Sequence, residues 1–167
     1  MTALQKEYRT IPLTQGKVAL VDASDYAQLI QFRWHAAFDP RGNRWYAIRA
    51  ARSHKRTPVK MHRQIMGLQY GERLYVDHAD GDGLNNRKVN LRICTQMQNS
   101  YNRGANANNK LGFKGVHFYP KTKKYAAHIT ANHKRIHLGY FNTPEEAHEA
   151  YCKASALHHG KFSGVIQ

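Results

Sequence analysis

Cysteine is almost absent from this chain: its 167 residues include only Cys94 and Cys152, which stand far apart. Two such residues cannot build a disulfide framework or a CxxC zinc site, so we expect two reduced thiols. Long apolar runs are missing as well, and none approaches the roughly 18 residues of a membrane-spanning helix. Residues 1–7 contain no apolar signal segment, so we expect neither a membrane partner nor secretion.

Acidic side chains are also few, because 11 Asp and Glu stand against 26 Lys and Arg, for a net charge of +15. Self-repulsion of this size indicates a polyanionic partner. The 41% hydrophobic and 11% aromatic content is enough for packed cores, which excludes a disordered basic tail. Charge by itself leaves DNA, RNA and an anionic membrane open. The imbalance is strongest in residues 113–143, which contain basic side chains and no acidic one.

The first part of the chain has the pattern of a mixed α/β region. Asp22 suits a helix N-cap, and apolar residues at helical spacing continue from there to Trp34. The Gln15-Gly16 pair predicts a turn between the first two strands. The remaining expected elements are strands at 9–13, 17–21 and 45–48, and a strand or short helix at 59–67.

Residues 100–112 have the composition of a linker, since Asn, Ser and Gly dominate and apolar side chains are too few for a core. Beyond them, strands are expected at 115–119, 125–130 and 135–139. Thr143, Pro144 and Glu146 form a capping box with proline at the first helical position. The helix that they start ends at Gly160. A three-stranded sheet packed on this helix is the simplest core that these elements can make.

The most informative run begins at Asp77 and His78, which end a strand-like segment. A polar loop with glycines follows, and then come an apolar piece at 90–93 and a helix-prone run at 95–99. This strand–loop–strand–helix order predicts that Asp77, His78 and Asn99 meet at one end of a hairpin.

These residue types suit hydrolysis of a phosphodiester bond. Asp77 and Asn99 offer hard oxygen ligands, which favour one Mg²⁺ or Mn²⁺ ion over Zn²⁺. Such an ion polarises the scissile phosphate and neutralises the leaving oxygen. His78 titrates near neutrality and can deprotonate the attacking water, while Asn90 can pin the loop through backbone groups. An ordinary turn is the alternative; a calcium loop would need an acidic spacing and a closing Glu that are missing.

The run resembles the HNH (ββα-metal) endonuclease motif in its His-Asn-Asn variant. The resemblance is carried by Asp77-His78, by Asn90 thirteen residues after Asp77, and by Asn99 nine residues further on. It implies that Asp77 and Asn99 bind the metal. It also implies that His78 is the general base and that Asn90 orients the loop, so these two are the expected catalytic residues. Many members have His where this chain has Asn99, which points away from a zinc-preferring site.

The upstream Met61-His62-Arg63 resembles a segment that precedes the motif in these enzymes, so His62 and Arg63 are possible near-site residues. A purely structural histidine is the alternative interpretation of His62. The motif is typical of phage- and intron-encoded members. The resemblance therefore implies a homing-type endonuclease that acts on double-stranded DNA without a small-molecule cofactor. We expect it in the cytoplasm of a bacterium or a phage-infected host cell.

The C-terminal stretch, over roughly residues 112–164, resembles the AP2/ERF DNA-binding domain. The segments that carry the resemblance are 114–116, 125–129, 137–141 and 143–151. It implies that the sheet lies in the major groove while the helix only backs it. Alternation along the strands gives the DNA-facing candidates Lys114, His117, Tyr119, His128, Thr130, Arg135 and His137.

Family positions that usually hold Arg or Trp are His117, Tyr119, Thr130 and His137 in this chain. We therefore expect a contact dominated by phosphates, without carrying over any base specificity. A solvated basic sheet face is the alternative for the same residues. The lack of acidic side chains from 113 to 143 favours the DNA contact.

The sequence thus predicts an α+β protein in which an N-terminal α/β region leads into a ββα-metal core, followed by a small three-stranded antiparallel sheet on one helix. Expected domains are 1–103 (motif 75–103), a linker at 104–112, and 113–167. Further phosphate contacts are expected from Arg44, Arg49, Arg52, Lys55, Arg56 and Lys60.

A non-catalytic, AP2-like regulator with a decayed nuclease fold is the competing class, against which the complete Asp-His-Asn-Asn set argues. An RNA-binding protein is disfavoured, because RRM and KH signatures are missing.

Overall fold

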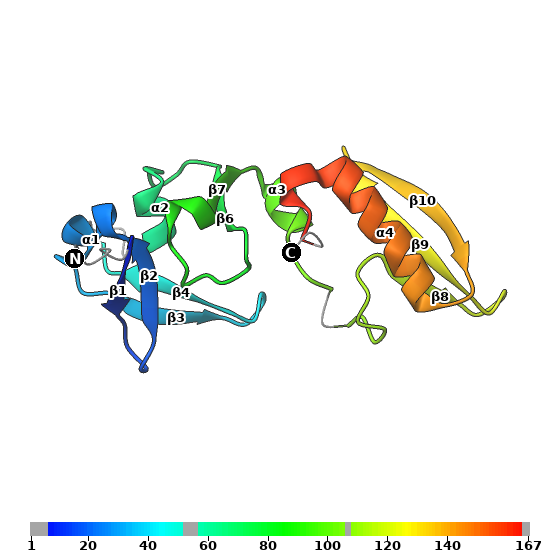
Figure 1. The fold of residues 1–167 in the computed structure, drawn as a ribbon, viewed down its shortest axis with the longest axis horizontal. Helices are drawn as coiled ribbons and strands as arrows, with labels where there is room; N and C mark the ends of the chain where they lie inside the picture. Colours follow the sequence, from blue (N-terminus) through cyan, green and yellow to red (C-terminus); the bar gives the residue numbers. More distant parts are fainter. Residues whose placement is uncertain (1–6, 52–56, 106–107, 165–167) are drawn as a thin grey trace, which may run out of the picture. The chain divides into compact units, whose positions relative to one another are not determined.

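The structure is a computed structural model that describes residues 7–51, 57–105 and 108–164. Contacts divide the chain into two compact units, Met1–Asn99 and Ser100–Gln167 (Figure 1). Several small antiparallel sheets and few helices confirm the predicted α+β class. None of the helices in the described ranges has the length and apolarity needed to cross a bilayer.

The first unit begins with a hairpin of β1 (Tyr8–Pro12) and β2 (Val18–Asp22), followed by α1 (Ala23–Leu29). The prediction that this helix continues to Trp34 is wrong. The Trp34 indole N–H donates to the Leu29 carbonyl oxygen at 2.8 Å, so the ring turns back onto the end of the helix. Trp34 is consequently buried in the core beside the hairpin rather than on a longer helical face.

A three-stranded sheet follows, in which β4 (Arg44–Arg49) lies between β3 (His35–Asp39) and β5 (Val59–Lys60). The sequence did not predict β3, because its two alanines are poor strand formers and give no clear alternation. Its pairing with β4 supplies the strand instead. Helix α2 (Met61–Ile65) follows β5 directly and buries Met61 in the same core.

The last elements of the unit are β6 (Tyr75–His78), the 3₁₀ turn η1 (Lys88–Asn90) and β7 (Leu91–Cys94). Helix α3 (Gln96–Tyr101) comes next, and the boundary between the units falls within it. In the antiparallel β6–β7 pair Asp77 lies opposite Arg92 and His78 opposite Leu91. Both cysteines are free in this structure, and burial raises the pKa of the Cys94 thiol to about 11.

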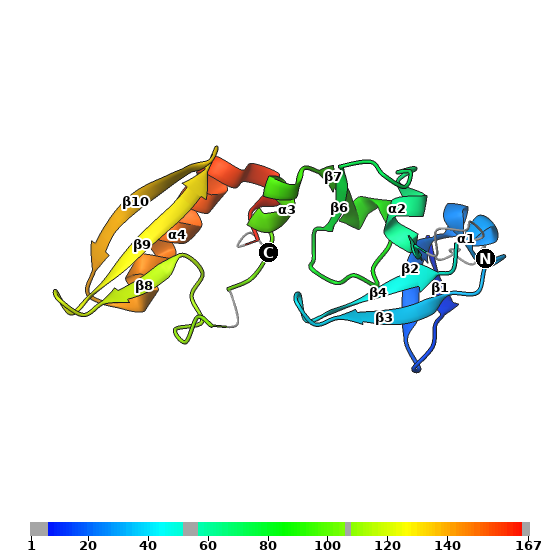
Figure 2. The ribbon, with the colours of Figure 1, turned by 180° about the vertical axis from the view of Figure 1, so that it is seen from behind.

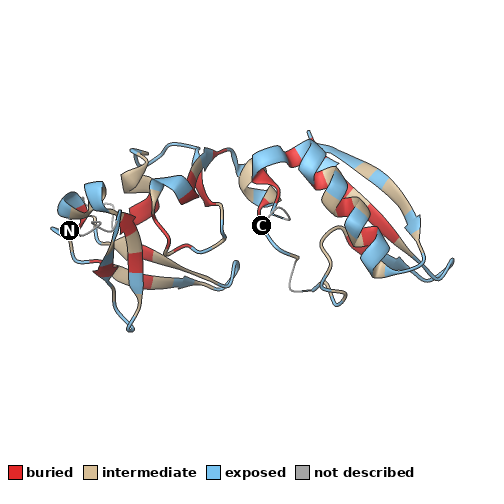
Figure 3. Ribbon diagram, viewed as in Figure 1, coloured by how far each residue is buried: buried red, intermediate tan, exposed pale blue. Residues whose placement is uncertain are grey.

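The second unit is a sheet of β8 (Val116–Tyr119), β9 (Lys124–Ala131) and β10 (Lys134–Phe141), with β9 in the middle. Helix α4 (Pro144–His159) covers one face, and Figure 2 shows the face that it leaves open. The Thr143–Glu146 capping box is formed, and the short η2 (Gly160–Phe162) follows the helix. Buried residues recur along α4 (Figure 3). Ala147 of this helix packs on Val116 and Ala127 of the sheet.

Candidate functional site

Asp77 and His78 end β6 in the first unit, and both are buried, with exposed fractions of 2% and 3%. The chain then forms a loop that returns through η1 to β7. Two backbone hydrogen bonds start this loop: Ala79 N–H donates to the Asn90 carbonyl at 2.9 Å, and Gly81 N–H donates to the His78 carbonyl at 3.0 Å. The strand end and the loop together form the candidate site.

Asn90 holds the loop closed from its other end. Its amide oxygen accepts from the Asp80 N–H at 3.0 Å. Its amide nitrogen donates to Asp80 Oδ1 and to the Asn85 carbonyl, each at 2.8 Å. The Asp80 carboxylate also accepts from the Asn85 side chain at 2.6 Å, so the loop is a closed hydrogen-bond network. The Asn90 side chain therefore bridges the beginning and the end of the loop.

The His78 ring is enclosed by side chains from two other elements. The His62 ring of α2 stands perpendicular to it with centroids 5.0 Å apart, and the Tyr46 ring of β4 lies 5.9 Å away. Gly83 of the loop lies so close to β4 that a side chain there would collide with the Trp45 carbonyl and the Tyr46 ring. Water consequently reaches His78 only when some of these covering groups move.

Burial lowers the pKa of His78, while the Asn86 side chain and the Asp80, Asp77 and Asp82 carboxylates act in the opposite direction. Burial also holds the pKa of His62 well below its usual range, and the nearby His78, Lys60 and Arg63 lower it further. Both imidazoles are therefore neutral near pH 7. A neutral imidazole is the form that accepts a proton as a general base.

The structure brings His62 next to His78, but it places Arg63 elsewhere. The Arg63 guanidinium donates to the Leu74 carbonyl at 2.6 Å and to the Gln69 carbonyl at 2.8 Å. It thus ties down the loop that leads into β6. Neither side chain can be assigned such a position from local sequence alone, because both depend on how α2 packs against β4 and β6.

Asp77 is paired with a residue that the sequence interpretation did not single out. The Arg92 guanidinium meets Asp77 Oδ2 through two nitrogens, with the Nε contact at 3.0 Å, and the pair is largely buried. A signal for it exists in the sequence, since an antiparallel β6–β7 hairpin places Arg92 opposite Asp77. The pair orients the carboxylate and shields it from solvent.

The donor types of Asp77 and Asn99 fit a hard divalent cation. HNH nucleases generally use divalent metal ions, and Asp77 offers a carboxylate oxygen while Asn99, half-buried on α3, offers an amide oxygen. Within the described residues no three His, Cys, Asp or Glu side chains gather at one point. Mg²⁺ is commonly held by one or two protein oxygens together with water and substrate phosphates, so two ligands are compatible with such an ion.

Three histidines lie side by side on the open face of the second unit, one from each strand. His128 of β9 is in the middle, and its Nε2 is 3.1 Å from His137 Nδ1 of β10. The His117 ring of β8 lies 6.0 Å from the His128 ring. Burial and the neighbouring Arg135, His137 and His117 lower the pKa of His128. The open face therefore carries three adjacent imidazoles, and the pKa of the middle one is lowered.

A register shift between His137 and Gly139 in β10 adds an aromatic residue to this face. Because of the shift, the Tyr140 ring lies 4.8 Å from the His137 ring and 5.8 Å from the Tyr119 ring. Sequence alternation did not single out Tyr140, although a glycine within a strand is a known signal for a bulge. Thr130 and Arg135, both expected on this face, are exposed and pair across β9 and β10.

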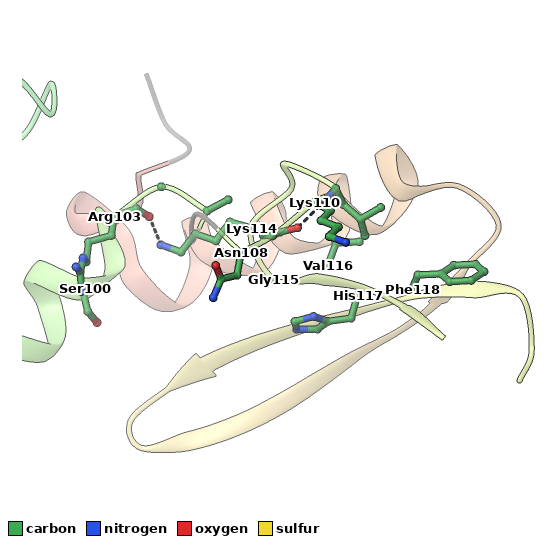
Figure 4. Close-up of a pocket in the computed structure, with 13 residues that line it drawn as sticks. Ser100, Arg103, Asn108, Lys110, Lys114, Gly115, Val116, His117 and Phe118 are labelled. Atoms are coloured by element: carbon green, nitrogen blue, oxygen red, sulfur yellow. Dashed lines mark hydrogen bonds between the residues drawn. The ribbon is translucent and has the colours of Figure 1, made fainter. Parts of the chain in front are cut away.

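The Lys114 ammonium is held by backbone carbonyls of residues that lie outside the sheet. It donates to the Tyr101 carbonyl at 2.7 Å. It also donates to the Arg103 carbonyl at 2.6 Å, a contact that Figure 4 shows. Burial, followed by the nearby Arg103 charge, lowers the pKa of Lys114 to about 8. The side chain forms part of the wall of a cavity of about 810 Å³, together with Lys110 and His117. Its contacts are those of a residue that stabilises the start of the unit.

Of the six basic residues of the first unit that were expected to contact phosphates, Arg49 and Lys60 contact other side chains of this unit. Arg49 donates to Gln64 Oε1 at 3.0 Å and lies over the Phe32 ring, and Lys60 lies over the Tyr46 ring. Arg44 is half-buried on β4. The other three candidates for phosphate contacts, Arg52, Lys55 and Arg56, lie outside the described residues.

The order β6–loop–β7–α3, with a buried histidine at the end of β6, defines a site of the ββα nuclease class. Residues 59–101 match the family model of the HNH endonucleases, and residues 111–156 match that of the AP2 domain. The first match includes α2, and with it His62. The chain thus combines an HNH endonuclease domain with an AP2 domain, which makes it a nuclease with a DNA-binding module.

Two viral relatives are consistent with these matches. Over 153 residues the chain is 26% identical to an uncharacterised HNH endonuclease of Acanthamoeba polyphaga mimivirus, covering 89% of this chain and 74% of the relative. Over 61 residues it is 33% identical to Protein 3.8 of Escherichia phage T7, covering 36% of this chain and 50% of that protein. No solved structure matches the chain.

Proposed function

We propose that this nuclease is a homing-type endonuclease that hydrolyses phosphodiester bonds of double-stranded DNA, with His78 as general base. The observation that carries the proposal is the neutral His78 at the end of β6, held beside Asp77 by a loop that Asn90 closes. The viral origin of both relatives supports the homing type. A bacterium or a phage-infected cell, in its cytoplasm, is the setting that fits such a protein.

In this proposal each residue has one task. His78 takes the proton of the attacking water, and the oxygen then attacks the phosphorus as the bond to the leaving oxygen breaks. Asp77 and Asn99 would hold one Mg²⁺ or Mn²⁺ ion, which supplies charge stabilisation at the scissile phosphate when bound. Arg92 orients Asp77, and Asn90 keeps the loop in place. Entry of DNA has to displace part of the cover over His78.

The AP2 domain would supply the grip on DNA through its open sheet face. His117, His128 and His137 offer ring N–H donors to phosphates, and Arg135 offers a permanent positive charge. Tyr119 and Tyr140 add apolar contact area to the same face. We do not assign a role in DNA contact to Lys114, because its ammonium is bound to backbone carbonyls.

A plasmid-cleavage assay with Mg²⁺ or Mn²⁺ tests the proposal. Wild-type protein should convert supercoiled plasmid to nicked or linear form, and EDTA should stop the reaction. His78→Ala should lower the rate by about 10²–10⁴-fold, which is the usual contribution of a general base. Asn99→Ala should also lower the rate, whereas His133→Ala, in an exposed turn of the other unit, should not.

Two results would contradict the proposal. If His78→Ala and Asn99→Ala cleave as fast as wild type, these residues do not form the site. If wild-type protein binds DNA in a salt-sensitive manner but cleaves with neither metal, the chain acts as a DNA-binding regulator on a decayed nuclease fold.

A further inference from the structure

Asp22 stands at the N-cap position of α1, yet its carboxylate does not cap that helix. Instead its Oδ2 accepts a hydrogen bond of 2.8 Å from the backbone N–H of Lys88, 66 positions further along the chain. A carboxylate in this position ordinarily accepts from the first turn of its own helix, which stabilises the helix. Asp22 therefore accepts a hydrogen bond from a distant residue in place of the local bond that would cap α1.

The distant partner is the beginning of η1, the turn that carries Asn90. Lys88 is the first residue of η1. The first N–H group of a helical turn has no hydrogen-bond acceptor inside that turn, so the Lys88 N–H needs a partner from elsewhere. The Asp22 carboxylate fills this role, so it acts as a cap for η1 rather than for α1. Since Asn90 ends the same three-residue turn, its direction depends on how the turn begins.

Strand β2 also holds the other end of the loop. Leu20 N–H donates to the Leu84 carbonyl at 2.9 Å, and Asn86 N–H donates to the Leu20 carbonyl at 2.7 Å. Asn86 is fully buried, and its side chain lies near enough to His78 to raise the pKa of the imidazole. The Leu20 backbone and the Asp22 side chain, both in β2, thus hold the chain on either side of Arg87.

We propose that Asp22 is a positioning residue of the nuclease site, which acts through the Lys88 N–H to hold residues 84–90 where Asn86 and Asn90 support His78. The proposal rests on the proposed nuclease function. It makes the N-terminal hairpin a working part of the site, although that hairpin lies outside the residues that match the HNH endonuclease family.

Steady-state cleavage kinetics of Asp22→Ala, Asp22→Asn and wild type test this role. Loss of an outer support of this kind typically lowers activity by about 10- to 100-fold, so Asp22→Ala should lower kcat by this factor. KM should change less than about twofold, because Asp22 does not touch DNA in the proposal. Asp22→Asn keeps an oxygen that accepts from the Lys88 N–H, and it should restore kcat to within about threefold of wild type.

Asp25→Asn is the matched control. It weakens the neighbouring ion pair of Asp25 with the Lys88 ammonium, at 2.7 Å, while the Asp22 contact stays. Its kcat should equal that of wild type. The proposal is overturned if Asp22→Ala keeps the wild-type kcat, if Asp22→Asn is as slow as Asp22→Ala, or if the loss appears in KM alone.

Hydrogen exchange of the wild-type protein provides a test that needs neither a folded variant nor activity. The Lys88 amide should exchange at least about tenfold more slowly than expected for an exposed loop amide, because it is bonded to Asp22. Unprotected exchange at Lys88 would overturn the inference even if the protein cleaves DNA. A protected Lys88 in a protein that does not cleave would instead support the contact and refute the nuclease proposal on which its catalytic role rests.

Discussion

The Arg92–Asp77 pair offers the sharpest test of how the site is stabilised. The Asp77 side chain is 1% exposed and that of Arg92 18%, so Arg92→Met leaves a buried carboxylate with its charged partner removed. Breaking a buried pair in this way costs about 3–5 kcal/mol. We expect the lower end, about 3 kcal/mol, because solvent already reaches part of Arg92 and can approach the carboxylate when the guanidinium is gone.

Urea denaturation at pH 7.5 measures this loss directly, with the transition of the first unit followed by Trp34 and Trp45 fluorescence. A change of 3 kcal/mol lowers the melting temperature of a domain of this size by roughly 12 °C or more. The double variant Asp77→Leu with Arg92→Met should be less unstable than Arg92→Met alone, because two apolar side chains leave no charge buried.

Arg73→Met is the matched control, since Arg73 is exposed in the loop before β6. It should change the free energy of unfolding by less than about 0.5 kcal/mol. If Arg92→Met is also within 0.5 kcal/mol of wild type, the pair does not stabilise the hairpin and the reasoning fails. The same conclusion follows if the double variant is less stable than the single one.

Three further predictions concern the loop and the sheet face. Asn90→Ala removes three side-chain hydrogen bonds and should cost about 3 kcal/mol in urea denaturation, with loss of cleavage. Gly83→Ala should destabilise the first unit by about 1–3 kcal/mol, because the new methyl group collides with backbone and ring atoms of β4. The third prediction is that DNA binding in EDTA strengthens as pH falls from 7.5 to 5.5, by up to about tenfold per pH unit for each linked proton. Phosphates favour protonated His128, whose pKa in the free protein is lowered, so the gain appears mainly below pH 6.5. His128→Gln should flatten this dependence in a fluorescence-anisotropy titration.

Each of these predictions has an outcome that contradicts it. Wild-type stability of Asn90→Ala would mean that the loop is held mainly by backbone contacts. A Gly83→Ala variant as stable as wild type would show that β4 can move away from the loop. Binding that weakens or stays constant as pH falls would exclude protonation of His128 on DNA contact.

The second unit was the easier one to predict because its signals are local. Thr143, Pro144 and Glu146 lie within four residues, and the capping box that they predict is formed at the start of α4. The end of α1 was mispredicted because it depends on Trp34, whose indole returns to Leu29 only when a core is present to receive the ring.

Local spacing also explains which parts of the candidate site the sequence could indicate. Asp77, His78 and Asn90 lie on one hairpin, so their separation along the chain is enough to place them around one loop. The groups that cover and support His78 come from elsewhere: Tyr46 from β4 and His62 from α2. Their positions depend on the packing of short elements whose contacts are set only in the folded unit.

Asp22 shows the same limit in its clearest form. From sequence alone, an aspartate before an apolar helical run is a helix cap, and every local signal agrees with that interpretation. In the folded chain the Asp22 carboxylate can accept either from an N–H group in the first turn of α1 or from the N–H group of Lys88. The backbone hydrogen bonds of Leu20 with Leu84 and Asn86 already bring η1 beside the end of β2, so accepting from the distant Lys88 N–H costs little additional ordering. A helix of only seven residues loses little by forgoing its cap, whereas the loop around His78 would lose one of the contacts that define it.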